Sequence, residues 1–403
     1  MTARHPRAVA AVTLGIFAIV TTEILPIGLL TPIADGFGVS PGVAGWTMTM
    51  PGFVAAVAAP VVTVATKRLD RRPMLAALML LLALSGFLTA AAPAFWVLLV
   101  ARFLVGLVIG GFWSIGAGLA PRLAPANTAR ATSVIFAAVP LGSVLGVPLG
   151  TLVGQLAGWR AAFLLLAVLS LAAFAALLVF VPPLPPGTVT RAAVLENLLR
   201  RPGVRSGLAV TFLVVLAHFG TYTYVTALLS PGLTSAYLLV YGAAGIAGTF
   251  LAGTRRLPVT FTAAALLIAV AAAALPFAGP IGAFPLLVVW GLGYGAVPVC
   301  SQTWFARAAP DAPEAATVVF TASFQATLSA GALAGGFVVD ALSVPAVMVG
   351  GALAAVVAAV TVQGTRRTVA PARSARGISA TASTAASSRS RSSADAGESS
   401  STR

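Results

Sequence analysis

Charged side chains are scarce in this sequence. Only 8% of its 403 residues are Asp, Glu, Lys or Arg, whereas 59% are hydrophobic. About a quarter of the residues of a soluble domain are charged, so this chain cannot build a water-facing surface. Most of its exterior must face lipid, and only helices or closed β-barrels cross lipid. The polar–apolar alternation of barrel strands is missing, and the long apolar runs favour helices.

Cysteine and histidine are nearly absent as well. Cys300 is the single cysteine, which excludes an intramolecular disulfide, and His5 and His218 are the only histidines. The sequence also lacks a phosphate-binding G-x-x-x-x-G-K-[ST] loop, a G-x-S-x-G elbow and an H-E-x-x-H pair. We therefore expect no metal, no cofactor and no enzymatic activity. An intramembrane enzyme or a membrane sensor is the rival class to a transporter.

Twelve apolar segments are long enough to span a bilayer, which takes about 20 helical residues. They cover residues 8–30, 43–66, 74–92, 95–120, 129–153, 161–181, 207–229, 233–253, 259–277, 281–305, 315–339 and 345–362. We predict an all-α integral membrane protein with two pseudo-symmetric six-helix bundles around a central cavity. Its parts are an N-terminal bundle (1–182), a cytoplasmic linker (183–206), a C-terminal bundle (207–363) and a basic, Ser-rich tail (364–403). The tail has almost no large apolar residues and is expected to be disordered.

The net charge of +15 follows this topology. With the N-terminus inside, 22 of the 24 Lys and Arg residues fall on inner segments, Arg160 falls outside, and Arg102 lies within a span. The positive-inside rule describes this asymmetry. It predicts that both termini are cytoplasmic, in a multi-pass protein of the cell membrane. The charge therefore calls for no nucleic-acid partner.

Glu23 is the only acidic residue deep in a predicted span, and Arg102 is the only basic one. A buried charge in a bilayer is costly, and such residues usually face a cavity and often carry protons. Each lies 7 residues from the outer end of its span, so both sit about 10 Å below the outer boundary. A pair between them is therefore possible, with Glu23 coupling protons and Arg102 stabilising its ionised form. The alternative is a structural Glu bonded to a neighbouring helix.

Two motifs add detail. Gly142, Gly146, Gly150 and Gly154 recur at a spacing of four with Pro148 among them, which places the glycines on one helix face for close packing. The loop Lys67-Arg68-Leu69-Asp70-Arg71-Arg72 follows the second span. We expect Asp70, Arg71 and Arg72 to form a charged hinge between helices.

These motifs resemble those of a known family. Gly142-x-x-x-Gly146-Val147-Pro148-Leu149-Gly150 is similar to the antiporter motif of the drug:proton antiporters of the major facilitator superfamily, and Arg102-x-x-x-Gly106 is similar to their fourth-helix motif. Thr22-Glu23-Ile24-Leu25-Pro26 resembles the first helix of their bacterial efflux branch. The segments Gly111-Phe112-Trp113 and Trp290-Gly291-Leu292 look most like the purine ribonucleoside efflux pumps. The loop departs from the superfamily signature G-x-L-x-D-R-x-G-R-R, of which Asp70 and Arg71 fit.

The resemblance implies a secondary active efflux transporter. Its partners would be lipid, protons and a small molecule, and it would act as a monomer. Purine ribonucleosides lead as substrates, and multidrug, chloramphenicol or sugar efflux are the alternatives. A nucleoside needs ring stacking and hydrogen bonds, and the expected cavity residues are His218, Tyr222, Tyr294, Gln325 and Trp113. Hydrogen bonds between helices are the other reading of these polar side chains.

Overall fold

The structure is a computed structural model that describes residues 4–66, 69–116, 119–185, 192–252 and 257–365. Within these ranges the chain is helical apart from short connections. Twelve helical segments there are long and apolar enough to cross a membrane, from Pro6–Gly28 to Val344–Gly364. The prediction of an all-α, twelve-span protein is confirmed. The predicted tail falls outside the described ranges except for its first two residues.

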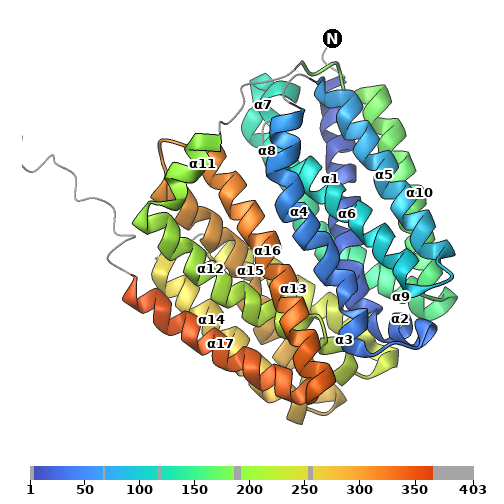
Figure 1. The fold of residues 1–403 in the computed structure, drawn as a ribbon, viewed down its shortest axis with the longest axis vertical. Coiled ribbons are helices and arrows are strands. Elements are labelled where there is room, and N and C mark those ends of the chain that lie inside the picture. The colour runs from blue at the N-terminus through green and yellow to red at the C-terminus, as the bar shows by residue number, and fades with distance from the viewer. Residues whose placement is uncertain (1–3, 67–68, 117–118, 186–191, 253–256, 366–403) are drawn as a thin grey trace, which may run out of the picture.

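The N-terminal half occupies one side of the molecule (Figure 1). Its spans are α1 (Arg4–Gly28), α4 (Trp46–Ala65), α5 (Arg71–Ala91), α6 (Phe95–Gly116), the pair α8 and α9 (Thr128–Leu141 and Val147–Ala157) and α10 (Trp159–Phe180). A π-helical turn, η2 (Gly142–Gly146), joins α8 to α9. The short elements are α2 (Leu30–Phe37), α3 (Pro41–Ala44), α7 (Leu119–Leu123) and the 3-10 turn η1 (Pro125–Asn127).

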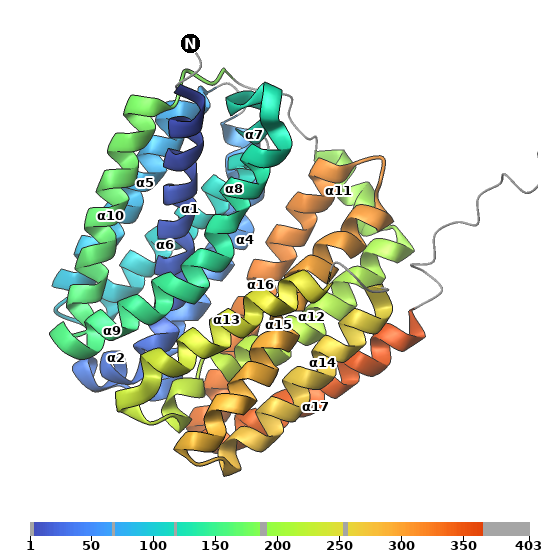
Figure 2. The same cartoon turned by 180° about the vertical axis from the view of Figure 1, so that it is seen from behind.

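The C-terminal half lies beside it, as the view from behind shows (Figure 2). Its spans are α12 (Pro202–Tyr222), α13 (Thr234–Ala252), α14 (Leu257–Ala274), α15 (Pro280–Ala308), α16 (Pro313–Ala341) and α17 (Val344–Gly364). The short helix α11 (Ala192–Leu199) precedes them, and the 3-10 turns are η3 (Val225–Leu228), η4 (Pro231–Leu233) and η5 (Leu275–Phe277).

The two halves repeat the same packing. In the first half α4 packs on α6 and α5 on α10, and in the second half α13 packs on α15 and α14 on α17. These are the second and fourth spans, and the third and sixth spans, of each half. Between the halves, α4 packs on α16 while α9 and η2 pack on α13. Each half thus offers its second span to the fifth span of the other, which is the arrangement of pseudo-symmetric repeats.

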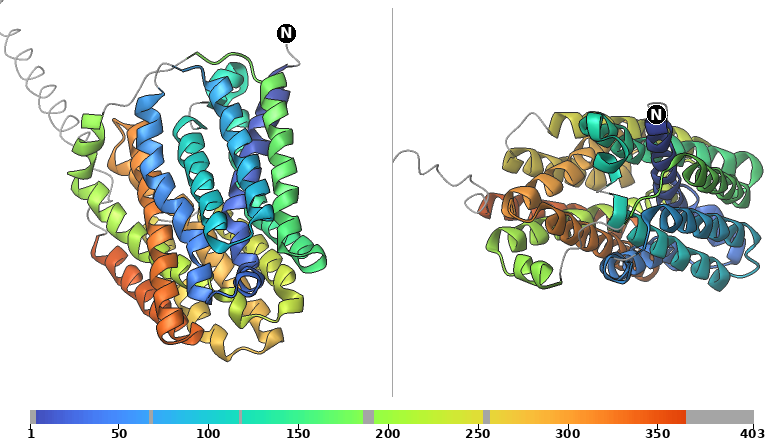
Figure 3. Two further views of the ribbon diagram at one scale, coloured as in Figure 1. Left: turned by 45° about the vertical axis from the view of Figure 1, so that its right-hand side comes forward. Right: turned by 90° about the horizontal axis from the view of Figure 1, so that it is seen from above.

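The arginines mark one end of the molecule. Arg71, Arg122 and Arg307 lie where α5 begins and where α7 and α15 end, and we call this the basic end. The opposite end, called the distal end, carries the turns at Gly38, Gly158 and Ser230. Among the residues that the structure describes, the basic side chain at the distal end is Arg160. Its guanidinium lies over the rings of Trp159 and Phe37. Figure 3 shows the same ribbon turned by 45° about the vertical axis and seen from above.

Hydrogen bonds between the halves gather toward the distal end. The carboxylate of Asp340, at the end of α16, accepts from Ser40 Oγ at 2.7 Å and from the backbone N–H of Gly42 at 2.9 Å. Thr226 donates to the carbonyl of Ile27 at 3.0 Å. Gln155 donates to the carbonyl of Pro231 at 2.6 Å. These bonds hold the halves together at the distal end of the spans.

The loop motif at the basic end is tied to the first half of the chain. Asp70 caps α5 by accepting from the N–H of Arg72 at 2.8 Å, and it also accepts from the N–H of Leu184 at 3.1 Å. The N–H of Arg71 donates to the carbonyl of Leu184 at 2.9 Å, and Arg72 donates to the carbonyl of Leu178. The predicted hinge loop therefore holds the end of α10 and the start of the linker in this conformation.

A second contact at the basic end involves the C-terminal half. Arg201, just before α12, forms two hydrogen bonds with the carboxylate of Asp311, at 2.6 and 2.7 Å. These bonds lower the pKa of the Asp311 carboxyl to about 2. Both side chains are exposed, so water screens the pair and it adds little to stability.

Candidate substrate and proton site

Glu23 lies on α1, where the two halves meet. Its side chain is 8% exposed, and its Oε1 accepts a hydrogen bond of 2.9 Å from the amide of Gln325 on α16. Gln325 is buried as well. The two residues are 302 positions apart and belong to different halves. The one acidic side chain deep in a span is therefore bonded across the interface between the bundles.

Arg102 does not pair with that carboxylate. Its guanidinium, 1% exposed, donates Nε to the carbonyl of Thr47 at 2.8 Å, Nη1 to the carbonyl of Thr22 at 2.9 Å and Nη2 to the carbonyl of Glu23 at 3.1 Å. Among the residues that the structure describes, the ion pairs are Arg200–Glu196 and Arg201–Asp311. The pair that matching depth made possible is thus replaced by contact with the backbone of Glu23.

Two prolines explain why these carbonyls are available. In an α-helix the carbonyl of residue i accepts from the N–H of residue i+4, and proline has no N–H. Pro26 lies inside α1 and Pro51 inside α4. They leave the carbonyls of Thr22 and Thr47 without a helical donor. Arg102 donates to both, which compensates the cost of burying its charge and of leaving backbone acceptors unpaired.

The glycine stripe positions α1 from the other side. Gly142, Gly146, Gly150 and Gly154 face, in that order, Val20, Thr21 and Leu25 of α1 and Leu29, which joins α1 to α2. The last three of these residues also recur every four positions. A Cβ at Gly146 would overlap the Thr21 hydroxyl, and one at Gly150 would lie 2.7 Å from a Leu25 methyl. The motif with Pro148 therefore packs closely against the helix that carries Glu23.

The polar residues predicted in the second half form a stack of rings. His218 lies nearly parallel to Tyr294, with ring centroids 3.5 Å apart, and to Tyr222 at 4.9 Å. Tyr222 in turn stacks on Tyr241 at 4.4 Å. His218, Tyr222 and Tyr241 are buried, whereas Tyr294 is partly exposed. Tyr294 is therefore the ring of the stack that is partly accessible.

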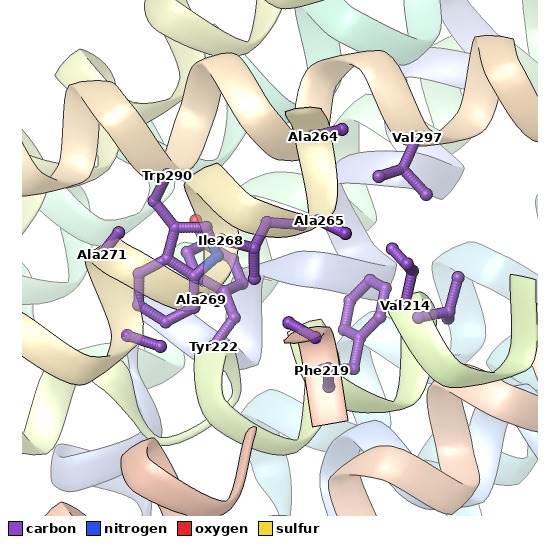
Figure 4. Close-up of a cluster of buried hydrophobic side chains, with 14 of the residues drawn as sticks. Val214, Phe219, Tyr222, Ala264, Ala265, Ile268, Ala269, Ala271, Trp290 and Val297 are labelled. Atoms are coloured by element: carbon purple, nitrogen blue, oxygen red, sulfur yellow. The ribbon is translucent and has the colours of Figure 1, made fainter. Parts of the chain in front are cut away.

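Trp290 and Phe219 border the stack through edge-on ring contacts. Figure 4 shows Trp290 with Tyr222, and Phe219 in the same buried cluster. The indole Nε1 of Trp290 lies 3.0 Å from Nδ1 of His218. Phe219 meets Tyr294 edge-on at 5.7 Å and Phe324 at 6.3 Å. Phe324 precedes Gln325 in α16, so this ring contact joins the stack to the helix that carries Gln325.

The structure separates one predicted cavity residue from the others. Glu23 and Gln325 are hydrogen-bonded to each other, and Tyr294, His218 and Tyr222 stack on one another. Trp113 instead packs in the N-terminal half, against Phe136, with ring centroids 6.2 Å apart. Its place in the cavity was predicted because it is deep in its span, and depth does not report which neighbour a side chain meets.

Sequence reasoning missed Tyr241, Trp290 and the backbone partners of Arg102. The prolines did carry a signal, because a proline four positions after Thr22 and after Thr47 marks a carbonyl free to accept. The only sequence signal for Trp290 was its position in the middle of a span. Tyr241 is an aromatic residue in the middle of the span that follows the one with Tyr222, and this position alone does not identify a contact.

Comparison with known proteins defines the class. Residues 12–326 match the Major Facilitator Superfamily, so the chain belongs to this family of membrane transporters. The fold agrees with a solved bacterial homologue of the human lysosomal transporter Spinster, at a TM-score of 0.71 and 14% identity over 92% of this chain and 98% of that one. It also agrees with the human organic anion transporter MFSD10, at a TM-score of 0.65 and 17% identity over 89% and 99%.

Two further relatives are more similar to this chain in sequence than these solved structures are. The purine ribonucleoside efflux pump NepI of Escherichia coli K12 is 35% identical over 346 residues, which are 83% of this chain and 87% of that protein. The transcription regulatory protein OpdE of Pseudomonas aeruginosa is 36% identical over 350 residues, 82% and 87% of the two chains. The resemblance to major facilitator efflux transporters noted in the sequence is confirmed.

Proposed function

We infer that this transporter exports purine ribonucleosides, or small molecules of similar shape, in exchange for protons. The observation that carries the proposal is the hydrogen bond from Gln325 to the carboxylate of Glu23, beside the aromatic stack that ends at Tyr294. A titratable group and a platform for a planar ring thus occur together where the two halves meet. The names of the NepI relatives support the same substrate class.

The Glu23–Gln325 bond links a proton to the relative position of the halves. An ionised carboxylate only accepts hydrogen bonds, whereas a protonated one also donates and is a weaker acceptor. Protonation of Glu23 therefore changes the strength of a bond between the bundles. In an alternating-access cycle, Glu23 takes up a proton on the outer side and releases it inside, while substrate moves outward.

The aromatic stack suits a nucleobase. Offset or parallel rings attract each other, and a partly exposed ring at the end of a stack can extend it by one more ring. Tyr294, the partly exposed ring of the stack, would hold the base, and Gln325 and Glu23 would supply hydrogen-bonding groups. Chloramphenicol-like drugs and sugars are the alternative substrates, and sugars gain less from stacking because they have no aromatic ring.

Orientation follows from charge. The basic end carries Arg71, Arg122 and Arg307 and should face the cytoplasm, with both termini on that side. The protein would then lie in the bacterial cytoplasmic membrane as a monomer, with hinge-like contacts at Asp70, Arg71 and Arg72 on the inner side.

Everted membrane vesicles test the proposal. Their lumen corresponds to the outer side, so a lumen acidified by respiration should drive labelled adenosine into vesicles that contain the protein. Nigericin, which collapses the pH gradient, should stop the accumulation, and excess unlabelled purine nucleoside should compete. Accumulation that ignores nigericin would contradict proton coupling, and accumulation of chloramphenicol instead of adenosine would contradict the substrate class.

A further inference from the structure

The contact between Trp290 and His218 fixes where the histidine keeps its proton. Trp290 Nε1 lies 3.0 Å from His218 Nδ1, and both side chains are fully buried. The indole N–H can only donate, so Nδ1 must present its lone pair. A neutral imidazole then carries its proton on Nε2. An imidazolium would place an N–H on Nδ1 against the indole N–H, which excludes it while this contact persists.

The next bond takes its direction from this one. His218 Nε2 lies 3.4 Å from the hydroxyl oxygen of Tyr241 on α13. Because Nε2 carries the proton, the histidine donates and the Tyr241 oxygen accepts. The proton of Tyr241 is therefore directed away from His218. The bonds run in one sense, from Trp290 through His218 to Tyr241, and end on a hydroxyl that has a proton to donate.

We propose that Trp290 is a positioning residue, which holds His218 as the neutral Nε2–H tautomer and thereby keeps the Tyr241 hydroxyl as a donor directed away from His218. His218 stacks directly on Tyr294, the ring that the proposed function assigns to the substrate base. The part that concerns substrate therefore rests on that function: Trp290 holds the ring that supports the platform for the base.

The surroundings of His218 agree with a histidine that binds and does not titrate. The titratable side chains that face it are tyrosines: Tyr222 on its own helix, Tyr241 on α13 and Tyr294 on α15. No acidic partner contacts the ring among the described residues. Histidine is the side chain that most readily changes charge near neutral pH. Protonation of His218 would break its hydrogen bond with Trp290, so the proposal assigns the coupled proton to Glu23.

Nuclear magnetic resonance can read this tautomer directly, because the chain has only two histidines. In a His5→Gln variant labelled with ¹⁵N-histidine and placed in lipid nanodiscs, His218 is the sole signal. Its Nε2 should show a protonated nitrogen and Nδ1 an unprotonated one, unchanged between pH 8 and pH 6. An Nδ1–H tautomer, or an imidazolium pattern at pH 6, would overturn the proposal, whatever the protein transports.

Two tryptophan variants then locate the cause. Trp290→Phe removes the donor, and since Tyr241 can donate or accept, both tautomers of His218 should appear. Trp304→Phe is the matched control, because Trp304 is also buried on α15 and donates its indole N–H, but to the carbonyl of Gly203. Its spectrum should equal that of the parent. A single Nε2–H tautomer in the Trp290→Phe variant would show that Trp290 does not set it.

Transport kinetics test the consequence for substrate. Trp290→Phe releases the His218 ring that supports Tyr294, so it should raise the KM for adenosine exchange by several-fold with little change in kcat. Trp304→Phe should leave the KM unchanged. An unchanged KM in Trp290→Phe would overturn the consequence for substrate. If the NMR result holds while adenosine is not transported at all, the tautomer stands and the proposed function fails.

Discussion

The guanidinium of Arg102 donates to the carbonyl oxygen of Thr22 at 2.9 Å, and this carbonyl is the one that Pro26 leaves without a helical donor. The same side chain reaches the carbonyl of Thr47, which Pro51 leaves free in α4. Arg102 therefore joins α6 to α1 and α4 at the carbonyls that their prolines leave free. Its charge is stabilised by backbone dipoles, and its position fixes the segment that carries Glu23.

Replacing Arg102 should destabilise the protein, and replacing the two prolines as well should restore part of the lost stability. Arg102→Met leaves two buried carbonyls unsatisfied, at about 1–3 kcal/mol each, and should lower the thermal stability measured in detergent. Adding Pro26→Ala and Pro51→Ala restores two backbone N–H donors. The triple variant should therefore recover much of the lost Tm. Arg102→Met with Pro60→Ala is the control, since Pro60 also lies inside α4.

An equal Tm for Arg102→Met and the triple variant would show that Arg102 does not act through these carbonyls. The comparison uses stability alone, so it is independent of substrate and proton coupling.

The glycine stripe makes a prediction about packing. Gly146→Leu inserts a side chain where the Thr21 hydroxyl and α1 already fill the space. Overpacking of this kind costs about 1–3 kcal/mol, so we expect transport to fall sharply while the protein still reaches the membrane. Gly350→Leu on α17 is the control, because no atom lies within 4 Å of a Cβ there. Loss of transport in both variants, or in neither, would contradict close packing at Gly146.

The distal contact at Asp340 predicts a shift between conformations. Gly42→Ala places a methyl group against the Asp340 carboxylate and the Gly336 carbonyl, so the halves should close less well. Spin labels at Val43 and Leu342, which are exposed, should show a larger share of long distances by pulsed electron paramagnetic resonance. Gly232→Ala, also near the distal end with nothing within 4 Å, should leave the distances unchanged. An unchanged distance distribution in Gly42→Ala would show that the Asp340 contact does not hold the two halves together at the distal end.

Hydropathy and charge were enough to predict the fold. Each span needs only its own apolar run to be stable in lipid, so α1 and α17 are visible in local sequence. The site depends on contacts between segments far apart, and local patterns do not report them. Matching depth made a Glu23–Arg102 pair possible. Arg102 contacts the backbone carbonyl of Glu23, whereas Gln325, from the other half, holds the carboxylate. The direction of the Trp290–His218 bond needed atomic positions as well.

The last prediction concerns Glu23 as the coupling residue. Glu23→Gln keeps the size of the side chain and a carbonyl oxygen that can accept from Gln325, but it removes the titration. Everted vesicles with this variant should not accumulate adenosine under a pH gradient. Exchange of labelled for unlabelled adenosine, with equal pH on both sides, should persist, because exchange needs alternating access and no net proton movement.

Two controls separate coupling from structure. Asp35→Asn removes another carboxylate, an exposed one on α2, and should leave pH-driven accumulation intact. Glu23→Asp keeps a titratable group but shortens it by one methylene, so it should weaken the bond to Gln325 and retain part of the accumulation. If Glu23→Gln still builds an adenosine gradient from ΔpH, the coupling proton binds elsewhere. If it loses exchange as well, Glu23 holds substrate or structure, since a residue that only carries the proton is dispensable when no proton has to move.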